Sequence, residues 1–373
     1  MKDTKLNYSL NVIARWFVGL VFLFSSFVKG VDPMGTAFKI QEYMTAWSIG
    51  SFTFEWALPF ATLLSVALIT AEFLVGVLLI TNSFRRLAAW LLVLMMLFFT
   101  VTTFIDALTN KVTDCGCFGD AVKLTNWQTF WKNIVLDVPT VWILLTCNLR
   151  RKRRFERDAI VFLFACAAMV VFALYNINHE PCIDFRPWKV GNRMTNTDPT
   201  LKMESFVSYR NRQTGEEVEV PSTQCYDYES DTLTWLCIGT RVVDPHEIAA
   251  PGFSMLDLND DDWSVDLIGS PDSIVIATAH HLDKVDADGT AALQALFHWA
   301  EQENVQLVLL TAALPEEVQA YLHEADLDQL EFYFADATAI ETMTRSNPGA
   351  VLLQDGVVLG KWHYKNIDRL IEK

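Results

Sequence analysis

Five apolar segments, each close to the roughly 20 residues that cross the hydrocarbon core of a bilayer, constrain the fold most strongly. They cover residues 11–28, 56–80, 87–105, 127–149 and 159–177. The first follows Lys2 and Lys5 as a secretory signal would, but residues 25–29 offer no small-x-small cleavage site, so we expect an uncleaved anchor. The front of the chain is therefore predicted to be a helical membrane bundle with five spans.

Charge divides the chain in two and predicts its orientation. Residues 1–176 hold 16 Lys/Arg and 11 Asp/Glu, whereas residues 177–373 hold 13 and 34. If the spans alternate, ten basic residues fall on the side of the N-terminus and five on the other side, which predicts a cytoplasmic N-terminus. The C-terminal domain is then periplasmic, in a bacterial inner membrane. Its acidity argues against nucleic acid and anionic lipid as its partners, and leaves a soluble protein or a small molecule.

The loop between the third and fourth apolar segments contains Cys115-Gly116-Cys117, which we take as the candidate catalytic pair. Two thiols separated by one glycine can close a tight, labile disulfide on the oxidising side of a membrane. A static disulfide and a pair of metal-ligating thiolates are the alternatives. Without further Cys or His close by in the sequence, zinc is poorly supported, and we expect no metal.

Charged residues inside apolar spans are costly and mark candidate functional positions. Arg15 and Glu72 are the strongest candidates, either neutralising each other or contacting a bound headgroup or cofactor. Asp137, two residues before Pro139, is a weaker candidate. Asp106 lies near the end of a span, where we expect it to reach water.

Residues 178–249 read as an irregular linker followed by short strands, and residues 250–373 as an α/β domain. Strands are expected at 273–279, 305–311 and 331–334, helices at 290–304 and 316–325, and a final hairpin at 350–354 and 357–362 before a closing helix near residue 366. This order resembles a thioredoxin fold. Cys225 and Cys237, 12 positions apart in the strand-rich region, are a candidate structural disulfide.

The reactive C-x-x-C of a thioredoxin-like domain is missing after the first of these strands. His280-His281-Leu282-Asp283 stands there instead, and we interpret the two histidines as part of a solvent-facing turn, with metal ligation as the alternative. Pro348 occupies the position of the cis-proline that presents backbone to an extended substrate chain, which makes it a candidate partner-binding residue. Cys182, just beyond the fifth span, is a candidate resolving thiol.

The membrane half resembles the DoxX and methylamine-utilisation MauE family of four-helix membrane proteins over residues 8–150. Three stretches carry the resemblance: residues 15–33 (RWFVG and FSSFVKGVDP), residues 72–76 (EFLVG) and residues 115–119 (CGCFG). The expected domains are then the four-helix bundle (1–150), a fifth transmembrane helix (151–177), the linker and strand-rich region (178–249) and the thioredoxin-like domain (250–373). The resemblance implies redox chemistry and allows a quinone as cofactor.

Two functions fit these features. In the first, Cys115 and Cys117 exchange thiol and disulfide equivalents with a periplasmic partner that docks on the thioredoxin-like domain. In the second, the chain is a non-enzymatic membrane scaffold that holds an envelope protein through its acidic domain, and the cysteine pair is structural.

Overall fold

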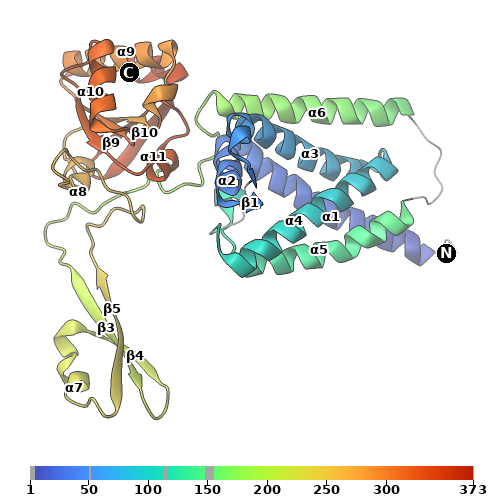
Figure 1. Ribbon diagram of the computed structural model, residues 1–373, viewed down its shortest axis with the longest axis horizontal. Helices are drawn as coiled ribbons and strands as arrows, with labels where there is room; N and C mark the ends of the chain where they lie inside the picture. Colours follow the sequence, from blue (N-terminus) through green and yellow to red (C-terminus); the bar gives the residue numbers. More distant parts are fainter. Residues whose placement is uncertain (1–4, 50–51, 113–115, 148–154, 373) are drawn as a thin grey trace. The chain divides into compact units, whose positions relative to one another are not determined.

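The structure is a computed structural model, and it describes residues 5–49, 52–112, 116–147 and 155–372 (Figure 1). Cys115, one of the two candidate catalytic cysteines, lies outside the described residues. The chain forms two compact units, Met1–Phe185 and Arg186–Lys373.

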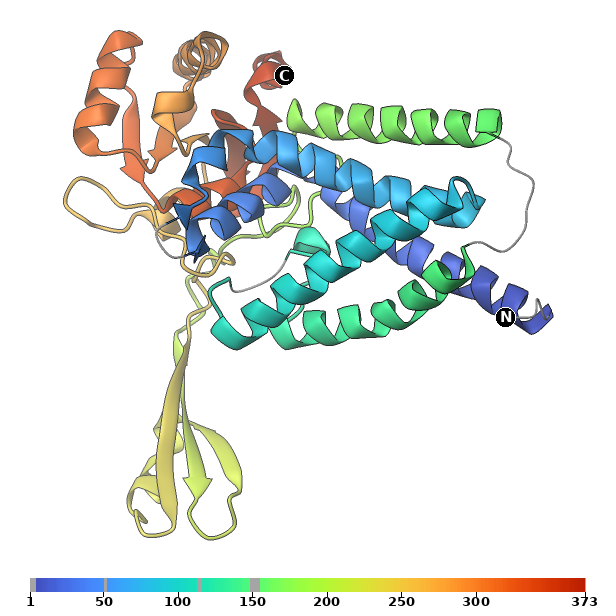
Figure 2. The same ribbon diagram turned by 45° about the vertical axis from the view of Figure 1, so that its right-hand side comes forward.

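The first unit is a helical bundle in which long helices lie side by side (Figures 1 and 2). Its long helices are α1 (Lys5–Val31), α3 (Ala61–Thr81), α4 (Arg85–Thr109), α5 (Asn126–Thr146) and α6 (Phe155–Ile177). Shorter elements join them: α2 (Pro33–Ala46), β1 (Ser48–Ile49), β2 (Phe52–Thr53) and the 3₁₀ turns η1 (Glu55–Phe60) and η2 (Gly119–Ala121). Each of the five predicted apolar segments coincides with one of the long helices over the described residues, whereas α2 was not predicted.

Four of the described helices are long and apolar enough to cross a membrane: Asn7–Val31, Glu55–Thr81, Arg85–Thr109 and Phe155–Ile177. They agree with four of the five predicted spans. The remaining one, α5, is 21 residues long and was predicted as the fourth span.

Helix α5 is less apolar because its buried face is polar. Its buried positions are mostly polar: Asn126, Thr129, Asn133, Leu136, Thr140, Ile143 and Thr146. Its outward positions are apolar: Trp127, Trp131, Val135, Val138, Val141 and Leu145. This is the reverse of a helix on a water-soluble protein, and it suits a helix whose outer face contacts lipid.

Polar side chains join α5 to its neighbours. Nδ2 of Asn133 donates to Oγ1 of Thr103 at 3.1 Å, and Oγ1 of Thr100 donates to Oδ2 of Asp137 at 3.0 Å. Both hydrogen bonds link α4 to α5, so Asn133 and Asp137 each have a partner on another helix.

Glycines let α1 and α3 approach closely. A Cβ on Gly76 would lie 2.8 Å from Cγ of Leu23 and 3.0 Å from the backbone oxygen of Gly19. A Cβ on Gly19 would likewise lie 3.2 Å from the oxygen of Gly76. Such small-residue contacts allow two backbones to pack within a membrane bundle.

The second unit contains a five-stranded sheet with helices on both faces. Its strands lie in the order β10–β9–β6–β7–β8. Strands β6, β7 and β8 run parallel, β9 is antiparallel to β6, and β10 is antiparallel to β9. The strands are β6 (Ile274–Ala279), β7 (Gln306–Thr311), β8 (Glu331–Phe334), β9 (Gly349–Gln354) and β10 (Val357–His363). The helices are α8 (Ser264–Ile268), α9 (Ala287–Glu303), α10 (Pro315–Glu324), α11 (Ala337–Met343) and α12 (Asp368–Ile371).

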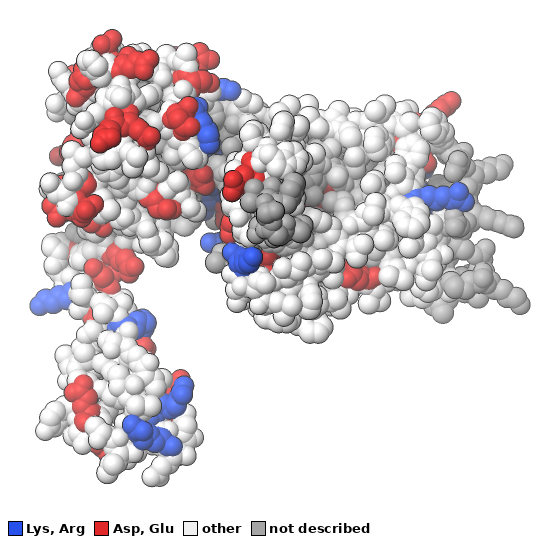
Figure 3. All heavy atoms as spheres, in the orientation of Figure 1, with Lys and Arg blue, Asp and Glu red and all other residues white. Residues whose placement is uncertain are grey.

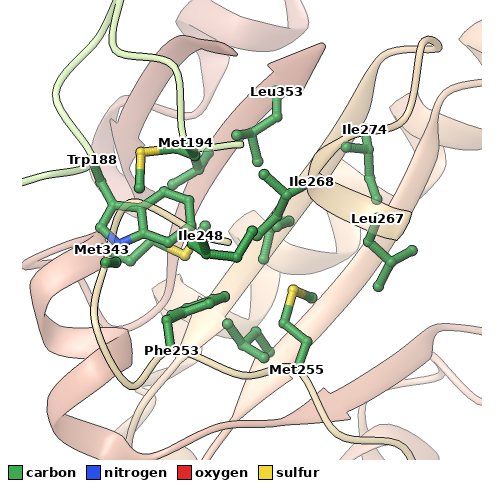
Figure 4. Close-up of a cluster of buried hydrophobic side chains, with 14 of the residues drawn as sticks. Trp188, Met194, Ile248, Phe253, Met255, Leu267, Ile268, Ile274, Met343 and Leu353 are labelled. Atoms are coloured by element: carbon green, nitrogen blue, oxygen red, sulfur yellow. The ribbon is translucent and has the colours of Figure 1, made fainter. Parts of the chain in front are cut away.

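All six residues of β6 are buried, as expected for a central strand with both faces covered. Ile274 and Ile276 face a core that includes Trp188 and Phe253, whose ring centroids lie 4.8 Å apart (Figure 4). Val275, Ala277 and Ala279 face a second core, which is covered by α9, α10 and α12.

A separate antiparallel sheet is formed by β4 (Glu217–Pro221), β3 (Glu204–Asn211) and β5 (Trp235–Val243), in that order, with the short helix α7 (Tyr226–Glu229) between β4 and β5 in the chain. Its core consists of Val207, Tyr209 and Val220. The predictions of a strand-rich region, of the α/β strands and of the final hairpin are confirmed. Helices α7, α8 and α11 were missed.

Surface charge differs between the units, as the sequence predicts. The visible face of the helical unit is largely uncharged, whereas acidic side chains gather over the α/β part of the second unit (Figure 3).

We predict that Gly76→Val lowers the stability of the bundle, because the added side chain meets Leu23 and the backbone of Gly19. Overpacking of this kind costs about 1–3 kcal/mol. Thermal unfolding of the full chain in detergent is the measurement. Ala67→Val, at an exposed position of the same helix, is the matched control. Equal melting temperatures for the two variants would contradict the close contact.

Candidate functional site

Cys117 lies in the segment between α4 and α5, and the structure ties its backbone to α1. The Ser25 hydroxyl lies 2.8 Å from the carbonyl oxygen of Cys117 and 3.0 Å from Oε2 of Glu72. The hydroxyl has a single proton, so it donates to one of these two acceptors at a time. A side chain of α1 thus connects the predicted catalytic segment to the charged residue of α3.

Glu72 is held by a buried ion pair with Lys29 of α1. Nζ of Lys29 lies 2.5 Å from Oε1 of Glu72, and the two side chains are 6% and 1% exposed. The Lys29 ammonium also lies 5.5 Å from the centre of the Phe99 ring. Two charges removed from water need partners of this quality, because the desolvation cost is otherwise several kcal/mol per ion.

Arg15 and Glu72 are not brought together, contrary to the expectation that they neutralise each other. Nη1 of Arg15 donates to the carbonyl oxygen of Leu79 at 3.4 Å. Leu79 is seven residues beyond Glu72, which is roughly 10 Å along the helix axis. The sequence identified Glu72 as a charge needing a partner, but placed that partner on the wrong residue.

Arg15 instead lines a small cavity with Asn11, Arg85 and Thr146, among others. Its volume of about 20 Å³ is enough for about one water molecule and far below that of a cofactor site. The predicted cofactor-binding pair is therefore split into two separate environments.

Asp106 is fully buried, which corrects the expectation that it reaches water. The Tyr43 hydroxyl donates to Oδ2 of Asp106 at 2.6 Å. Tyr43 belongs to α2, the helix that sequence reasoning missed, so this contact was not foreseeable.

Cys182 lies at the same end of α1 as the Cys117 segment. Its backbone N–H donates to Oδ1 of Asn176 at 3.1 Å, and Nδ2 of Asn176 donates to the carbonyl oxygen of Gly30 at 3.1 Å. The Cys182 side chain is exposed. Its predicted role as a resolving thiol stays a prediction.

In the second unit, the turn after β6 is joined to the loop before β9. The peptide bond between Asn347 and Pro348 is cis. The Asn347 side chain accepts from the backbone N–H of His281 at 3.2 Å and donates to its carbonyl oxygen at 2.7 Å. The turn predicted to replace a C-x-x-C therefore lies directly against the predicted cis-proline.

The two histidines do not form a solvent-facing turn. His280 is 6% exposed, and burial lowers its pKa to about 3, assisted by the charges of Lys284 and Arg345. Burial also lowers the pKa of His281. Both imidazoles are consequently neutral at pH 7. Burial raises the pKa of Glu341 to about 7, against the attraction of Arg345.

Among the described residues, no group of three or more His, Cys, Asp or Glu side chains could hold a metal ion. Cys225 and Cys237 are both free thiols in this structure. Cys237 is the cross-strand neighbour of Tyr209, and Cys225 packs on the same small core, so both belong to one module. Their predicted disulfide is not formed here and stays a prediction.

The helices of the first unit define a multi-pass membrane protein. Residues 7–146, which include α1 to α5, match the family model of the methylamine utilisation protein MauE. No curated protein and no solved structure matches the chain. The MauE part of the resemblance is thereby confirmed for this segment, while the DoxX part and the thioredoxin-like domain stay predictions.

We predict that Lys29→Met destabilises the protein by about 3–5 kcal/mol, because it leaves the Glu72 carboxylate buried without its counter-charge. Adding Glu72→Met to the same chain should recover most of the loss, since an apolar pair of similar volume has no desolvation cost. Thermal unfolding of the full chain in detergent gives both values. A double variant no more stable than Lys29→Met would contradict the ion pair.

The burial of His280 makes the stability of the second unit depend on pH. His280 stays neutral in the folded state down to about pH 3, whereas an unfolded histidine takes up its proton near pH 6.5. The unfolded state binds more protons between these values, so stability falls as the pH drops from 6.5 towards 3. His280→Asn should flatten this dependence, as measured by pulse proteolysis of the second unit in the full chain.

Glu341→Gln tests a pH dependence of the opposite sign, in which stability falls as the pH rises, and it should remove that dependence. The folded state holds a proton on Glu341 up to about pH 7, and the unfolded state loses it near pH 4.5, so this carboxyl lowers stability as the pH rises between them. A His280→Asn profile with the slope of the unaltered chain below pH 6.5 would show that His280 is not buried.

Proposed function

We propose that the chain exchanges thiol and disulfide equivalents with an extracytoplasmic protein through Cys115 and Cys117. The observation that carries the proposal is the hydrogen-bonded connection from Cys117 through Ser25 to the buried Lys29–Glu72 pair. An intramembrane ion pair is costly and marks a functional position by default. Here it holds the segment that contains a Cys-Gly-Cys.

A thiolate of the pair attacks one sulfur of the partner's disulfide and forms a mixed disulfide, and the partner's other sulfur leaves as a thiolate that takes up a proton. The second cysteine of the pair then displaces the partner, which leaves the pair oxidised and the partner reduced by two electrons. The reverse sequence oxidises a partner dithiol. A membrane quinone is the co-reactant that could accept electrons from the reduced pair.

The proposal includes a fifth crossing of the membrane by α5. Its apolar outer face supports this assignment, and its inward polar side chains explain a low overall hydropathy. Five crossings from a cytoplasmic N-terminus bring the Cys117 segment and the second unit to the periplasmic side of a bacterial inner membrane.

We further propose that the second unit is a thioredoxin-like domain that binds the partner without reacting with it. The order of the five-stranded sheet and the cis bond before Pro348 support the fold. Buried neutral His280 and half-buried His281 stand where a reactive dithiol would be. The matching family's description suggests that the whole protein has a membrane-associated role in methylamine utilisation.

The second candidate function is that of a membrane-anchored scaffold, in which the cysteine pair is structural. The histidines after β6 favour it, since the second unit lacks a dithiol at that turn. To separate the two functions, residues 201–373 can be expressed on a foreign membrane anchor. Restored growth would favour the scaffold and exclude an essential membrane dithiol.

The direct test is to trap mixed disulfides in cells. We expect either Cys115→Ser or Cys117→Ser to accumulate a covalent complex that disappears on reduction, because the remaining thiol attacks the partner and cannot be displaced. Non-reducing electrophoresis after acid quenching detects the complex.

Cys147→Ser is the matched control, since Cys147 is a half-buried cysteine at the end of α5. It should trap nothing and should support growth fully. If both loop variants behave as Cys147→Ser does, the thiol exchange is refuted.

A further inference from the structure

Cys117 is flanked in the chain by two residues that each contact a lysine from a different helix. Gly116 lies against Lys39 of α2: a Cβ on this glycine would be 3.2 Å from Cγ and 3.7 Å from Cε of Lys39. Phe118 lies beneath Lys132 of α5, whose Nζ is 4.5 Å from the ring centre. Each lysine therefore contacts a residue that is next to Cys117 in the chain.

Other contacts hold both lysines in place. Nζ of Lys39 lies 2.7 Å from Oε2 of Glu42 one turn along α2, and the lysine is mostly buried. The Phe118 ring packs on Phe24, with 5.5 Å between ring centroids. Gly116 has a φ of +61°, so a larger residue here would strain the backbone as well as displace Lys39.

We propose that Lys39 and Lys132 are positioning residues that stabilise the thiolate form of Cys117 and so prepare it for attack. This inference rests on the proposed thiol exchange and adds to it the groups that activate one of the two sulfurs. Cysteines next to lysine are the reactive ones, because the ammonium favours the anion over the neutral thiol.

Acidic groups around the segment moderate the effect. Glu72 is neutralised by Lys29, Asp106 accepts from Tyr43, and Glu42 offsets part of the charge of Lys39. Asp120 follows in the same loop and is half-buried. Since Glu42 offsets part of the charge of Lys39, we expect the loss of Lys132 to have the larger effect.

The test measures the reactivity of Cys117 itself, with no partner present. Full-length protein carrying Cys115→Ser is reduced in detergent, and the rate of Cys117 alkylation by iodoacetamide is followed from pH 5 to 10 by peptide mapping. We expect Lys39→Gln and Lys132→Gln each to slow alkylation at pH 7 about three- to tenfold and to shift the profile to higher pH, because one pKa unit is a tenfold change in thiolate.

Lys123→Gln is the matched control, since Lys123 is an exposed lysine of the same loop. It should leave the profile unchanged, and Lys39→Arg and Lys132→Arg should retain the fast rate because they keep the charge. If one Gln variant fails to accumulate, the other one decides the outcome with its Arg counterpart.

Profiles for Lys39→Gln and Lys132→Gln that coincide with Lys123→Gln would overturn the inference and leave the thiol exchange standing. An unreactive pair in cells combined with lysine-dependent alkylation in vitro would refute the exchange alone. The two failures are therefore distinguishable.

Discussion

The buried pair of Lys29 and Glu72 is the interaction on which the helical unit depends. It joins α1 to α3 in a part of the bundle where the two backbones already touch through glycines. Charges in such a place are stable only with fixed partners, and Ser25 extends the network to the Cys117 backbone. The same network thus joins two helices of the bundle and contacts the backbone of the cysteine segment.

Much of the fold follows from the sequence, because apolar period and length determine membrane helices and buried strands. The strand Glu331–Phe334 was predicted to the residue. The fourth apolar segment, predicted from residue 127, begins as α5 at Asn126 after a capping box at Thr125. Helix α2 was missed although Asp32 and Pro33 form a helix-start signal, with the Asp32 carboxylate accepting from Gly35. Helix α11 is seven residues long, too short for a periodic pattern.

The site was only partly predictable, since pairing is a tertiary property. Glu72 stands out as a charge among apolar residues, but nothing local indicates that its partner is Lys29 and not Arg15. Lys29 looked like an ordinary loop residue at the end of a span. The burial of His280 was missed for a similar reason: polar residues after a strand suggest a turn, and the contact of this turn with Asn347 is made only in the folded domain.

The membrane crossing that we propose for α5 has a consequence for how the protein enters the bilayer during synthesis, because the inward face of this helix is polar. A lone helix with Asn126, Asn133 and Asp137 facing lipid would leave their hydrogen-bonding groups unsatisfied in hydrocarbon. Because Thr100 and Thr103 of α4 satisfy two of these residues, α4 and α5 would partition into the membrane together, as a helical hairpin released from the insertion machinery as one unit.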